Sequence, residues 1–463
     1  MRGKTLPIDP LCVPKSPNMQ PNPYATDSLL ADSNALLAEP KSETPYYGWC
    51  MVLVGAIAMA ATLPGRTHGL GLITERLLVD FNTIDRREFA HFNLWATLIG
   101  AAFCLPCGWL IDRVGVRHVA AAVLGSLALV VWWMSRLQDT TSLFIAVTLT
   151  RGIGQSMLSV VSITMVAKWF QRRLGMAMGV YTVLMGLMFA LGTPALGGRV
   201  KLLGWRDAWW ELSVVLAAVT PLVWLLARNE PRHRSLEFSD ANQRKTMDTN
   251  DGATLLQALT SPCFWVFGGS ISFFGMVSSG ISLFNQNILN ERGFAEGTFH
   301  TVLMIGFLTG MVANLVSGGL SRRVPLQYLL SAAMFLLAAS YGSLAYVQTI
   351  GQVYAYAMVQ GFAGGTLTVM FFAVWGRAFG PAQLGRIQGA AQMMTVLASA
   401  IGPLVLAESR IARGSYHQVL LTFAAIAATF GLVAIFTTVP DAATGIWKAM
   451  ETEIAEPDAA LQS

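Results

Sequence analysis

Two arginines inside long apolar segments carry the most informative chemistry in this sequence. Arg66 follows Pro64 and Gly65 in an apolar segment at about 47–76, and Arg151 begins the run Arg-Gly-Ile-Gly-Gln in another at 142–169. A charged side chain at the middle of a membrane helix costs about 2.5–3.5 kcal/mol or more, so it usually serves a function. A guanidinium presents a planar pair of N–H donors that matches carboxylate, phosphate or sulfonate oxygens. The two arginines therefore predict a site for an anionic substrate.

The two arginines are expected at one depth in the membrane. Arg66 lies about four residues beyond the middle of its segment, and Arg151 lies about four residues before the middle of a segment that runs the opposite way. At about 1.5 Å per residue, both lie roughly 6 Å from the midplane, on its external side. We therefore expect both guanidiniums to reach the same level of one cavity.

A candidate for proton coupling is His68. No Asp or Glu lies near the middle of any apolar segment, so a carboxylate relay is not evident. The unperturbed pKa of His, about 6.5, would let His68 carry a proton at that depth. His68 is two residues from Arg66 and projects from a different part of the helix surface, so joint action needs a distorted helix. A histidine that only forms a hydrogen bond within the bundle is the alternative.

The composition is that of a membrane protein. Hydrophobic residues make up 54% of the chain and charged residues 12%, with a mean hydropathy of +0.52, whereas soluble domains carry about 25% charged residues. A surface this apolar argues against nucleic acid as a partner and makes the lipid bilayer the expected one. About 20 apolar residues span a bilayer as a helix. Twelve such segments are predicted, at about 47–76, 89–111, 116–136, 142–169, 174–199, 208–228, 262–290, 298–320, 326–348, 351–376, 383–407 and 416–438.

Polar stretches divide these segments into two groups of six. We predict a disordered cytosolic tail at 1–45, a six-helix bundle at 46–228, a cytosolic linker at 229–261, a second bundle at 262–439 and a cytosolic tail at 440–463. With both termini in the cytosol, nineteen of the 31 Lys and Arg lie on the cytosolic side, where basic residues of membrane proteins concentrate. We therefore expect a multi-pass integral membrane protein, in the inner membrane if the source is bacterial.

Motifs for catalysis are absent from the sequence. The six His and five Cys show no metal-ligand spacing, and no set of nucleophile and base appears. The phosphate loop Gly-x-x-x-x-Gly-Lys is missing as well. We therefore expect neither an enzyme nor a bound cofactor or metal, and any uphill transport would be driven by another gradient.

The ten residues at 108–117, Gly-Trp-Leu-Ile-Asp-Arg-Val-Gly-Val-Arg, return in weaker form 210 positions later. A nearly fixed offset between apolar segments indicates a duplicated membrane bundle. The repeated positions are Gly108, Leu110 and Arg113, which return as Gly318, Leu320 and Arg323, and Gly175, Gly179 and Gly192, which return as Gly385, Gly389 and Gly402.

The segment at 108–117 resembles the signature of the major facilitator superfamily, Gly-x-Leu-x-Asp-Arg-x-Gly-x-Arg, and the chain is identified as a member over about 46–439. The resemblance implies an all-α membrane fold, with twelve transmembrane helices in two six-helix bundles around a cavity that opens alternately to each side. It also implies that the signature is a latch between the bundles. The second copy has Arg322 in the place of Asp112, so one good latch is expected. Its residues are Gly108, Asp112, Arg113, Gly115 and Arg117.

Two branches of this family are the most similar. The organic-anion branch similarly carries arginines in its first and fourth helices, which implies substrate binding by Arg66 and Arg151. Helices 1, 4, 7 and 10 line the cavity in the family, which adds Gln155, Asn285 and Gln360 to the predicted site. The monocarboxylate branch is suggested by Tyr-Gly-Trp at 47–49, although its charged pair in helix 8 is missing here. We predict a secondary transporter of a small organic anion, coupled to a proton or to an exchanged anion.

Two alternatives remain open. Gly192-Thr-Pro-Ala-Leu-Gly-Gly198 resembles the glycine–proline motif of the family's drug antiporters, but Thr193 departs from it. Efflux of a cationic or neutral drug would call for a membrane carboxylate, and none is found. The other alternative is a membrane nutrient sensor that keeps the fold without transporting. Its tails and linker are short and encode no recognisable signalling module.

Overall fold

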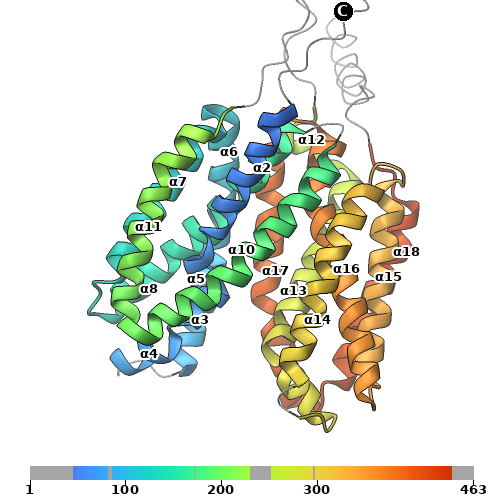
Figure 1. Ribbon diagram of the computed structural model, residues 1–463. Helices are drawn as coiled ribbons and strands as arrows, with labels where there is room; N and C mark the ends of the chain where they lie inside the picture. The colour runs from blue at the N-terminus through green and yellow to red at the C-terminus, as the bar shows by residue number, and fades with distance from the viewer. Residues whose placement is uncertain (1–44, 82–85, 171–172, 230–251, 296–297, 441–463) are drawn as a thin grey trace, which may run out of the picture. The chain divides into compact units, whose positions relative to one another are not determined.

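The described part of the chain is built from helices alone (Figure 1). The computed structural model describes residues 45–81, 86–170, 173–229, 252–295 and 298–440. Within these ranges, eleven helices are long and apolar enough to cross a membrane, and a shorter apolar helix lies at the start. The predicted all-α membrane fold is confirmed, and the helix count is consistent with twelve spans.

The first predicted segment is broken rather than continuous. It contains α2 (Pro45–Ala60), the 3₁₀ turn η1 (Leu63–Gly65), α3 (Thr67–Gly71) and α4 (Thr74–Asp80). Pro64 has no N–H to donate to a preceding turn, which favours an interruption there. Arg66 has an extended backbone between η1 and α3, with φ −91° and ψ 157°. The break therefore lies directly at the predicted substrate residue.

In the next five spans, two glycines form turns between successive helices. Gly115 (φ +93°) separates two of the helices and Gly204 (φ +91°) separates another two, in a left-handed region that glycine adopts without strain. The elements are α5 (Arg86–Ala102), α6 (Cys104–Val114), α7 (Val116–Met134), α8 (Thr140–Leu149), the π-helical segment η2 (Thr150–Met157), α9 (Leu158–Trp169), α10 (Leu174–Leu203) and α11 (Trp205–Leu226).

The second half repeats this order with fewer breaks. Its elements are α12 (Leu255–Thr260), α13 (Pro262–Glu291), α14 (Thr298–Leu320), α15 (Leu326–Leu344), α16 (Ile350–Phe379), α17 (Leu384–Arg413) and α18 (His417–Phe436). The short α12 lies within the predicted linker, begins with a capping box formed by Thr254 and Gln257, and packs on α13 and α17. The end of that linker is therefore part of the helical structure, while residues 230–251 lie outside the described ranges.

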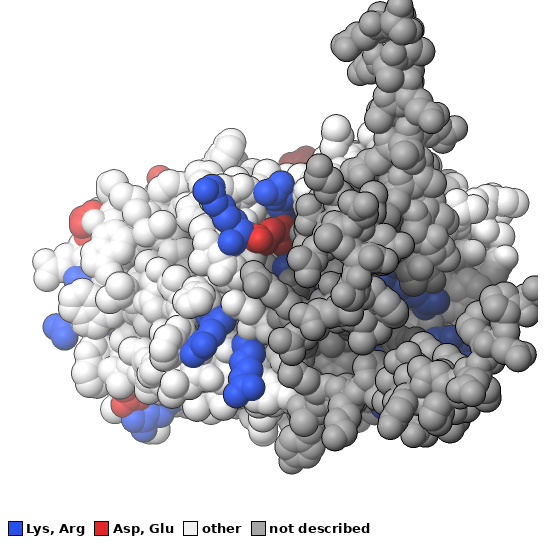
Figure 2. All heavy atoms as spheres, turned by 90° about the horizontal axis from the view of Figure 1, so that it is seen from above, with Lys and Arg blue, Asp and Glu red and all other residues white. Residues whose placement is uncertain are grey.

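We call the end of the helices that carries residues 108–117 the signature end. Figure 2 views the described residues from this end, and Lys and Arg side chains reach the surface there in several places. Arg113, Arg228, Arg322 and Arg323 are among the exposed residues. That this end faces the cytosol stays a prediction.

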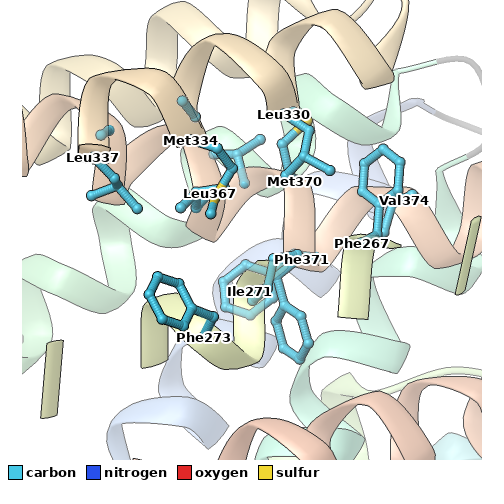
Figure 3. Packing of buried hydrophobic residues seen from close by; sticks show 14 of the residues in the cluster. Phe267, Ile271, Phe273, Leu330, Met334, Leu337, Leu367, Met370, Phe371 and Val374 are labelled. Atoms are coloured by element: carbon cyan, nitrogen blue, oxygen red, sulfur yellow. The ribbon is translucent and has the colours of Figure 1, made fainter. Parts of the chain in front are cut away.

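Buried side chains form two clusters. One comes from residues between Met51 and Ala227. The other comes mainly from residues between Ala253 and Ala434, joined by one face each of α2, α9 and α10. Figure 3 shows the centre of the second cluster, where Phe267 and Ile271 of α13 lie against Met370 and Phe371 of α16. The helices α2, α9 and α10 thus contribute buried side chains to both clusters and join the two halves.

The duplicated glycines pair reciprocally across the two halves. A Cβ built on Gly318 would lie 2.6 Å from the carbonyl O of Gly175, and one built on Gly385 would lie 2.6 Å from that of Gly108. Gly318 and Gly385 are the copies, at an offset of 210, of Gly108 and Gly175. The first half of the chain supplies one member of each pair and the second half supplies the other. The contact of Gly108 with Gly385 is thus repeated, with the two halves exchanged, by the contact of Gly318 with Gly175. This is the pattern of a two-fold interface. The same relation joins Gly179 to Asn314 and Gly389 to Cys104.

We expect Gly318→Ala to open the signature end. An added methyl group would push the Gly175 backbone away, and inserting a methyl group into a close-packed contact costs about 1–3 kcal/mol. The adjacent Gly319 on α14 has no atom within 4 Å of its ideal Cβ, so Gly319→Ala is the matched control. Alkylation of a cysteine placed at Ser321 would measure the change. Equal labelling rates in the two alanine variants would contradict the predicted role of this contact.

Candidate functional site

Arg66 is held in the break of the first span by neutral groups. Its Nε donates to Thr62 Oγ1 at 2.7 Å, and Nη2 donates to Met59 Sδ at 3.0 Å and to Ser159 Oγ at 3.2 Å. The guanidinium carbon lies 5.2 Å from the ring centre of Phe189 on α10. The side chain is partly buried.

Arg151 is more completely enclosed than Arg66. It is 2% exposed and lies in η2, where the helix widens to π geometry, as membrane and soluble helices frequently do at functional positions. Nη1 donates to the carbonyl O of Gly65 (3.1 Å), to Thr67 Oγ1 (3.2 Å) and to Gln155 Oε1 (2.7 Å). Nη2 donates to Asn93 Oδ1 at 2.5 Å. Arg151 therefore binds the residues on either side of Arg66.

Backbone packing joins the break to η2. A Cβ built on Gly65 would lie 2.9 Å from the backbone N of Gln155, and one built on Gly154 would lie 3.4 Å from Gly65 Cα. A methyl group on Gly65 would overlap the backbone of η2, so glycine is required there. Arg66 and Arg151 therefore lie near each other in the bundle, and their contacts with a substrate stay predictions.

No acid neutralises the two arginines within the described residues. The ion pairs found there join Asp112, Glu211, Asp80 and Glu291 to other basic residues. Arg151 Nε is buried and has no hydrogen-bond partner among those residues. Among the described residues, the two guanidiniums therefore have only neutral hydrogen-bond acceptors.

A cavity of about 360 Å³ lies between α10, α13, α14 and α16. Asn285 and Gln360, two of the predicted substrate residues, line it, whereas Arg66, Arg151 and Gln155 do not. Gln360 Oε1 accepts a hydrogen bond from Ser340 Oγ at 2.9 Å. The described lining contains no Asp, Glu, Lys, Arg or His. The five predicted substrate residues therefore fall into two groups, a cationic one and a neutral one.

Phe189 connects these two groups. Met185 and Gly186 line the cavity from α10, and Phe189 lies one turn further along the same helix, where Arg66 stacks on its ring. Phe189 also packs against both buried clusters. Arg66 is thus one aromatic side chain away from the cavity.

Several polar residues of the cavity were not predicted from the sequence. Ser278 and Ser282 line it from α13 beside the predicted Asn285, and the spacing of four and three residues places all three on one helix face. Thr368 lines it from α16, near Asn314 of α14. The spacing of Ser278 and Ser282 before Asn285 was the available signal, but serines in membrane helices more often bond within the helix.

His68, the predicted proton carrier, belongs to α3, but its side chain lies outside the described residues. The helix around it is broken at η1, as joint action with Arg66 would require. The role of His68 stays a prediction.

The predicted latch residues divide into two sets. Asp112 faces the second half, where its carboxylate accepts the backbone N–H groups of Gly385 and Arg386, each at 3.0 Å, and lies 3.5 Å from Lys168 Nζ. Gly385 and Arg386 open α17, so the carboxylate sits at the positive end of that helix dipole. Gly108 closes on the backbone of Gly385 beside it.

Arg113, Gly115 and Arg117 stay within the first half. The guanidinium carbon of Arg113 lies 5.0 Å from the ring centre of Trp109, and Gly115 forms the turn between α6 and α7. Arg117 Nε donates to the carbonyl O of Trp224 at 2.8 Å, at the end of α11. The basic partner of Asp112 in this conformation is therefore Lys168 and not the signature arginines.

Comparisons with known proteins place these features in context. The family model described as Major Facilitator Superfamily matches residues 47–403 and 269–455. A curated protein of Cronobacter sakazakii, described as multidrug resistance protein MdtD, is 31% identical over 154 residues. That match covers 32% of this chain and 32% of the relative, about a third of its length.

Solved structures share the fold. The human organic anion transporter MFSD10 (TETRAN) has a TM-score of 0.61 and 17% identity, with 84% of this chain and 98% of that chain covered. FucP in the outward conformation has a TM-score of 0.63 and 15% identity, with 85% and 98% covered. A further structure of the E. coli fucose:proton symporter FucP has a TM-score of 0.64 and 14% identity, with the same coverage. Identities this low establish the fold alone.

Proposed function

Because this chain belongs to the major facilitator superfamily, we propose that it moves a small organic anion across the membrane by alternating access. Arg66 contacts the anionic group, and Asn285 and Gln360 contact the rest of the substrate from the cavity wall. The opening and closing of the signature end through Asp112 exposes the cavity to each side in turn.

The observation that carries this proposal is the environment of Arg66. Its guanidinium is held by Thr62, Met59 and Ser159, all neutral, at a break in a membrane span and next to the cavity. A neutral side chain at that position would cost less free energy in a membrane span than a charged one. A carboxylate bound there would receive charge-assisted hydrogen bonds, which are shorter and stronger than neutral ones.

Arg151 and Gln155 support the same site from η2. Arg151 adds positive potential beside Arg66 and holds the backbone of the break through Gly65 and Thr67. Direct contact of Arg151 with the substrate remains a prediction, and it requires the exchange of at least one of its present acceptors for the anion.

Efflux of a drug is the second candidate. The neutral lining of the cavity and the partial similarity to a multidrug resistance protein favour it. Exchange assays in proteoliposomes separate the two candidates, using matched pairs of a carboxylic acid and its neutral amide, such as benzoate and benzamide. We expect exchange of acids and not of amides. Exchange of amides or of organic cations at equal rates would favour efflux of drugs instead.

We propose His68 as the proton carrier if transport is driven by pH. His68→Gln is then expected to abolish acid accumulation under a pH gradient while exchange of labelled for unlabelled acid continues, because exchange needs no net proton movement. Uptake in proteoliposomes with and without the gradient measures both. His118→Gln, at an exposed position of α7, is the control. Normal gradient-driven uptake by His68→Gln would remove His68 from the mechanism.

A further inference from the structure

The cavity between α10, α13, α14 and α16 is lined by two polar residues that each have an unpaired atom. Asn285 is 3% exposed and Asn314 is 9% exposed, and both line the cavity from adjacent helices, α13 and α14. The amide Oδ1 of each is buried and has no hydrogen-bond partner among the described residues. Buried polar groups in native proteins are nearly always paired, so two unpaired amide oxygens on residues that line one cavity point to a ligand or water as the partner.

The chemistry of a primary amide limits what this partner is. An amide presents both an acceptor and donors, and its two ends are assigned by surrounding hydrogen bonds. A hydroxyl group both donates and accepts, so it matches an amide in either orientation. An alkyl chain would leave both amide oxygens without a partner, which is unfavourable for buried polar atoms.

Further hydroxyl-binding groups lie in line with Asn285. Ser282 lines the cavity one turn before Asn285, and Ser278 two turns before it, on the same face of α13. Gln360 and Thr368 add polar groups from α16. The cavity therefore offers a row of neutral hydrogen-bonding side chains, and the described lining carries no charge of its own.

We propose that the substrate is a hydroxylated carboxylate of the sugar-acid class. Its carboxylate binds Arg66, and its hydroxyl groups bind the row formed by Ser278, Ser282, Asn285 and Asn314. A cavity of about 360 Å³ lies at the lower end of the range for small-molecule sites, about 300–1,000 Å³, which suits a molecule of this size. This inference rests on the proposed anion site at Arg66 and adds the chemistry of the remainder of the substrate.

Competition for binding to the purified full-length protein tests it, with radiolabelled gluconate as the probe. Hexanoate has the same number of carbons without the hydroxyls, and sorbitol has the hydroxyls without the carboxylate. We expect gluconate to bind at least about tenfold more tightly than either, because hexanoate lacks the hydrogen bonds of the hydroxyl groups and sorbitol lacks those of the carboxylate. Equal binding of gluconate and hexanoate, or no measurable binding of gluconate, would overturn the inference.

Variants assign the effect to the cavity wall. Ser282→Ala and Asn285→Leu are expected to weaken gluconate about three- to tenfold while hexanoate is unchanged, because each removes hydrogen bonds to hydroxyls only. Ser279 neighbours Ser278 on α13 but does not line the cavity, so Ser279→Ala is the matched control. Ser282 lies in an exposed position, so its truncation leaves the core packing intact even if Asn285→Leu unfolds. Equal weakening of both acids by Ser282→Ala would contradict the assignment.

Arg66→Gln separates this inference from the function on which it rests. If this variant binds neither gluconate nor hexanoate, and the parent protein binds both equally well, the hydroxyl assignment alone would be overturned. Unchanged binding of both acids in a folded Arg66→Gln protein would overturn the anion site itself. Sorbitol binding as tightly as gluconate would indicate a neutral polyol as the substrate and overturn both.

Discussion

Arg66→Gln is expected to weaken the binding of an organic anion by about 10- to 100-fold. The lost charge-assisted hydrogen bonds contribute about 1.5–3 kcal/mol, and every 1.4 kcal/mol is about tenfold in affinity. The protein should stay folded, because Thr62, Met59 and Ser159 hold Arg66 by neutral contacts and a partly buried charge has been removed. Equilibrium binding and thermal unfolding, measured on the same preparation, distinguish loss of the site from loss of the fold.

Two further variants sharpen this result. Arg66→Lys is expected to bind poorly as well, because a point charge cannot reproduce the two-pronged contact of a guanidinium with a carboxylate. Arg199 lies on α10 and pairs with Glu211 through a bidentate contact outside the cavity, so Arg199→Gln controls for the change in net charge. Normal anion binding by a folded Arg66→Gln protein would contradict the organic-anion function.

Asp112→Asn is expected to shift the protein toward the form that is open at the signature end. The carboxylate is 6% exposed, pairs with Lys168, and accepts two backbone hydrogen bonds from the start of α17. An amide keeps part of the hydrogen bonding and loses the charge. We therefore expect the form that is closed at the signature end to lose about 1.5–3 kcal/mol of stabilisation. A loss of that size changes the ratio of closed to open forms by about ten- to a hundredfold.

Cysteine accessibility at two positions measures this shift, in a chain whose native cysteines are replaced. Ser321 is buried at the signature end, next to Gly175, and Ser282 lines the cavity. With Asp112→Asn, we expect faster alkylation of a cysteine at 321 and slower alkylation of one at 282. The exposed Asp207 of α11 supplies the control variant, Asp207→Asn. Unchanged rates at both reporters would exclude a latch at Asp112.

The sequence determined the membrane fold and its internal duplication. Continuous apolar segments predict membrane-spanning helices, because every backbone polar group must form a hydrogen bond inside the bilayer. The offset between Gly108 and Gly318, and between Gly175 and Gly385, identified the glycines at which the halves meet, since only glycine permits such close backbone approach. The signature also identified Asp112 as the acid of the interface, and the family assignment followed from the same residues.

The tertiary structure decided which partners these residues have. The sequence placed Asp112 beside Arg113 and Arg117, but its basic partner is Lys168, which approaches from α9. The sequence assigned all five predicted substrate residues to one cavity. In the structure, Arg66, Arg151 and Gln155 lie at the break in the first span, whereas Asn285 and Gln360 line the cavity. Contacts between residues far apart in the chain depend on helix rotation and crossing, which periodicity along one segment does not specify.

Breaks in the helices were likewise visible only in part. Pro64 and Gly65 indicated a weak point in the first span, but the extended backbone of Arg66 follows from packing against η2. The π-helical segment around Arg151 was not predicted from the sequence, and its contacts with Asn93 and with the carbonyl O of Gly65 come from distant parts of the chain. The sequence thus determined which charges lie in the membrane, and the packing of two irregular segments against each other determined how those charges are presented.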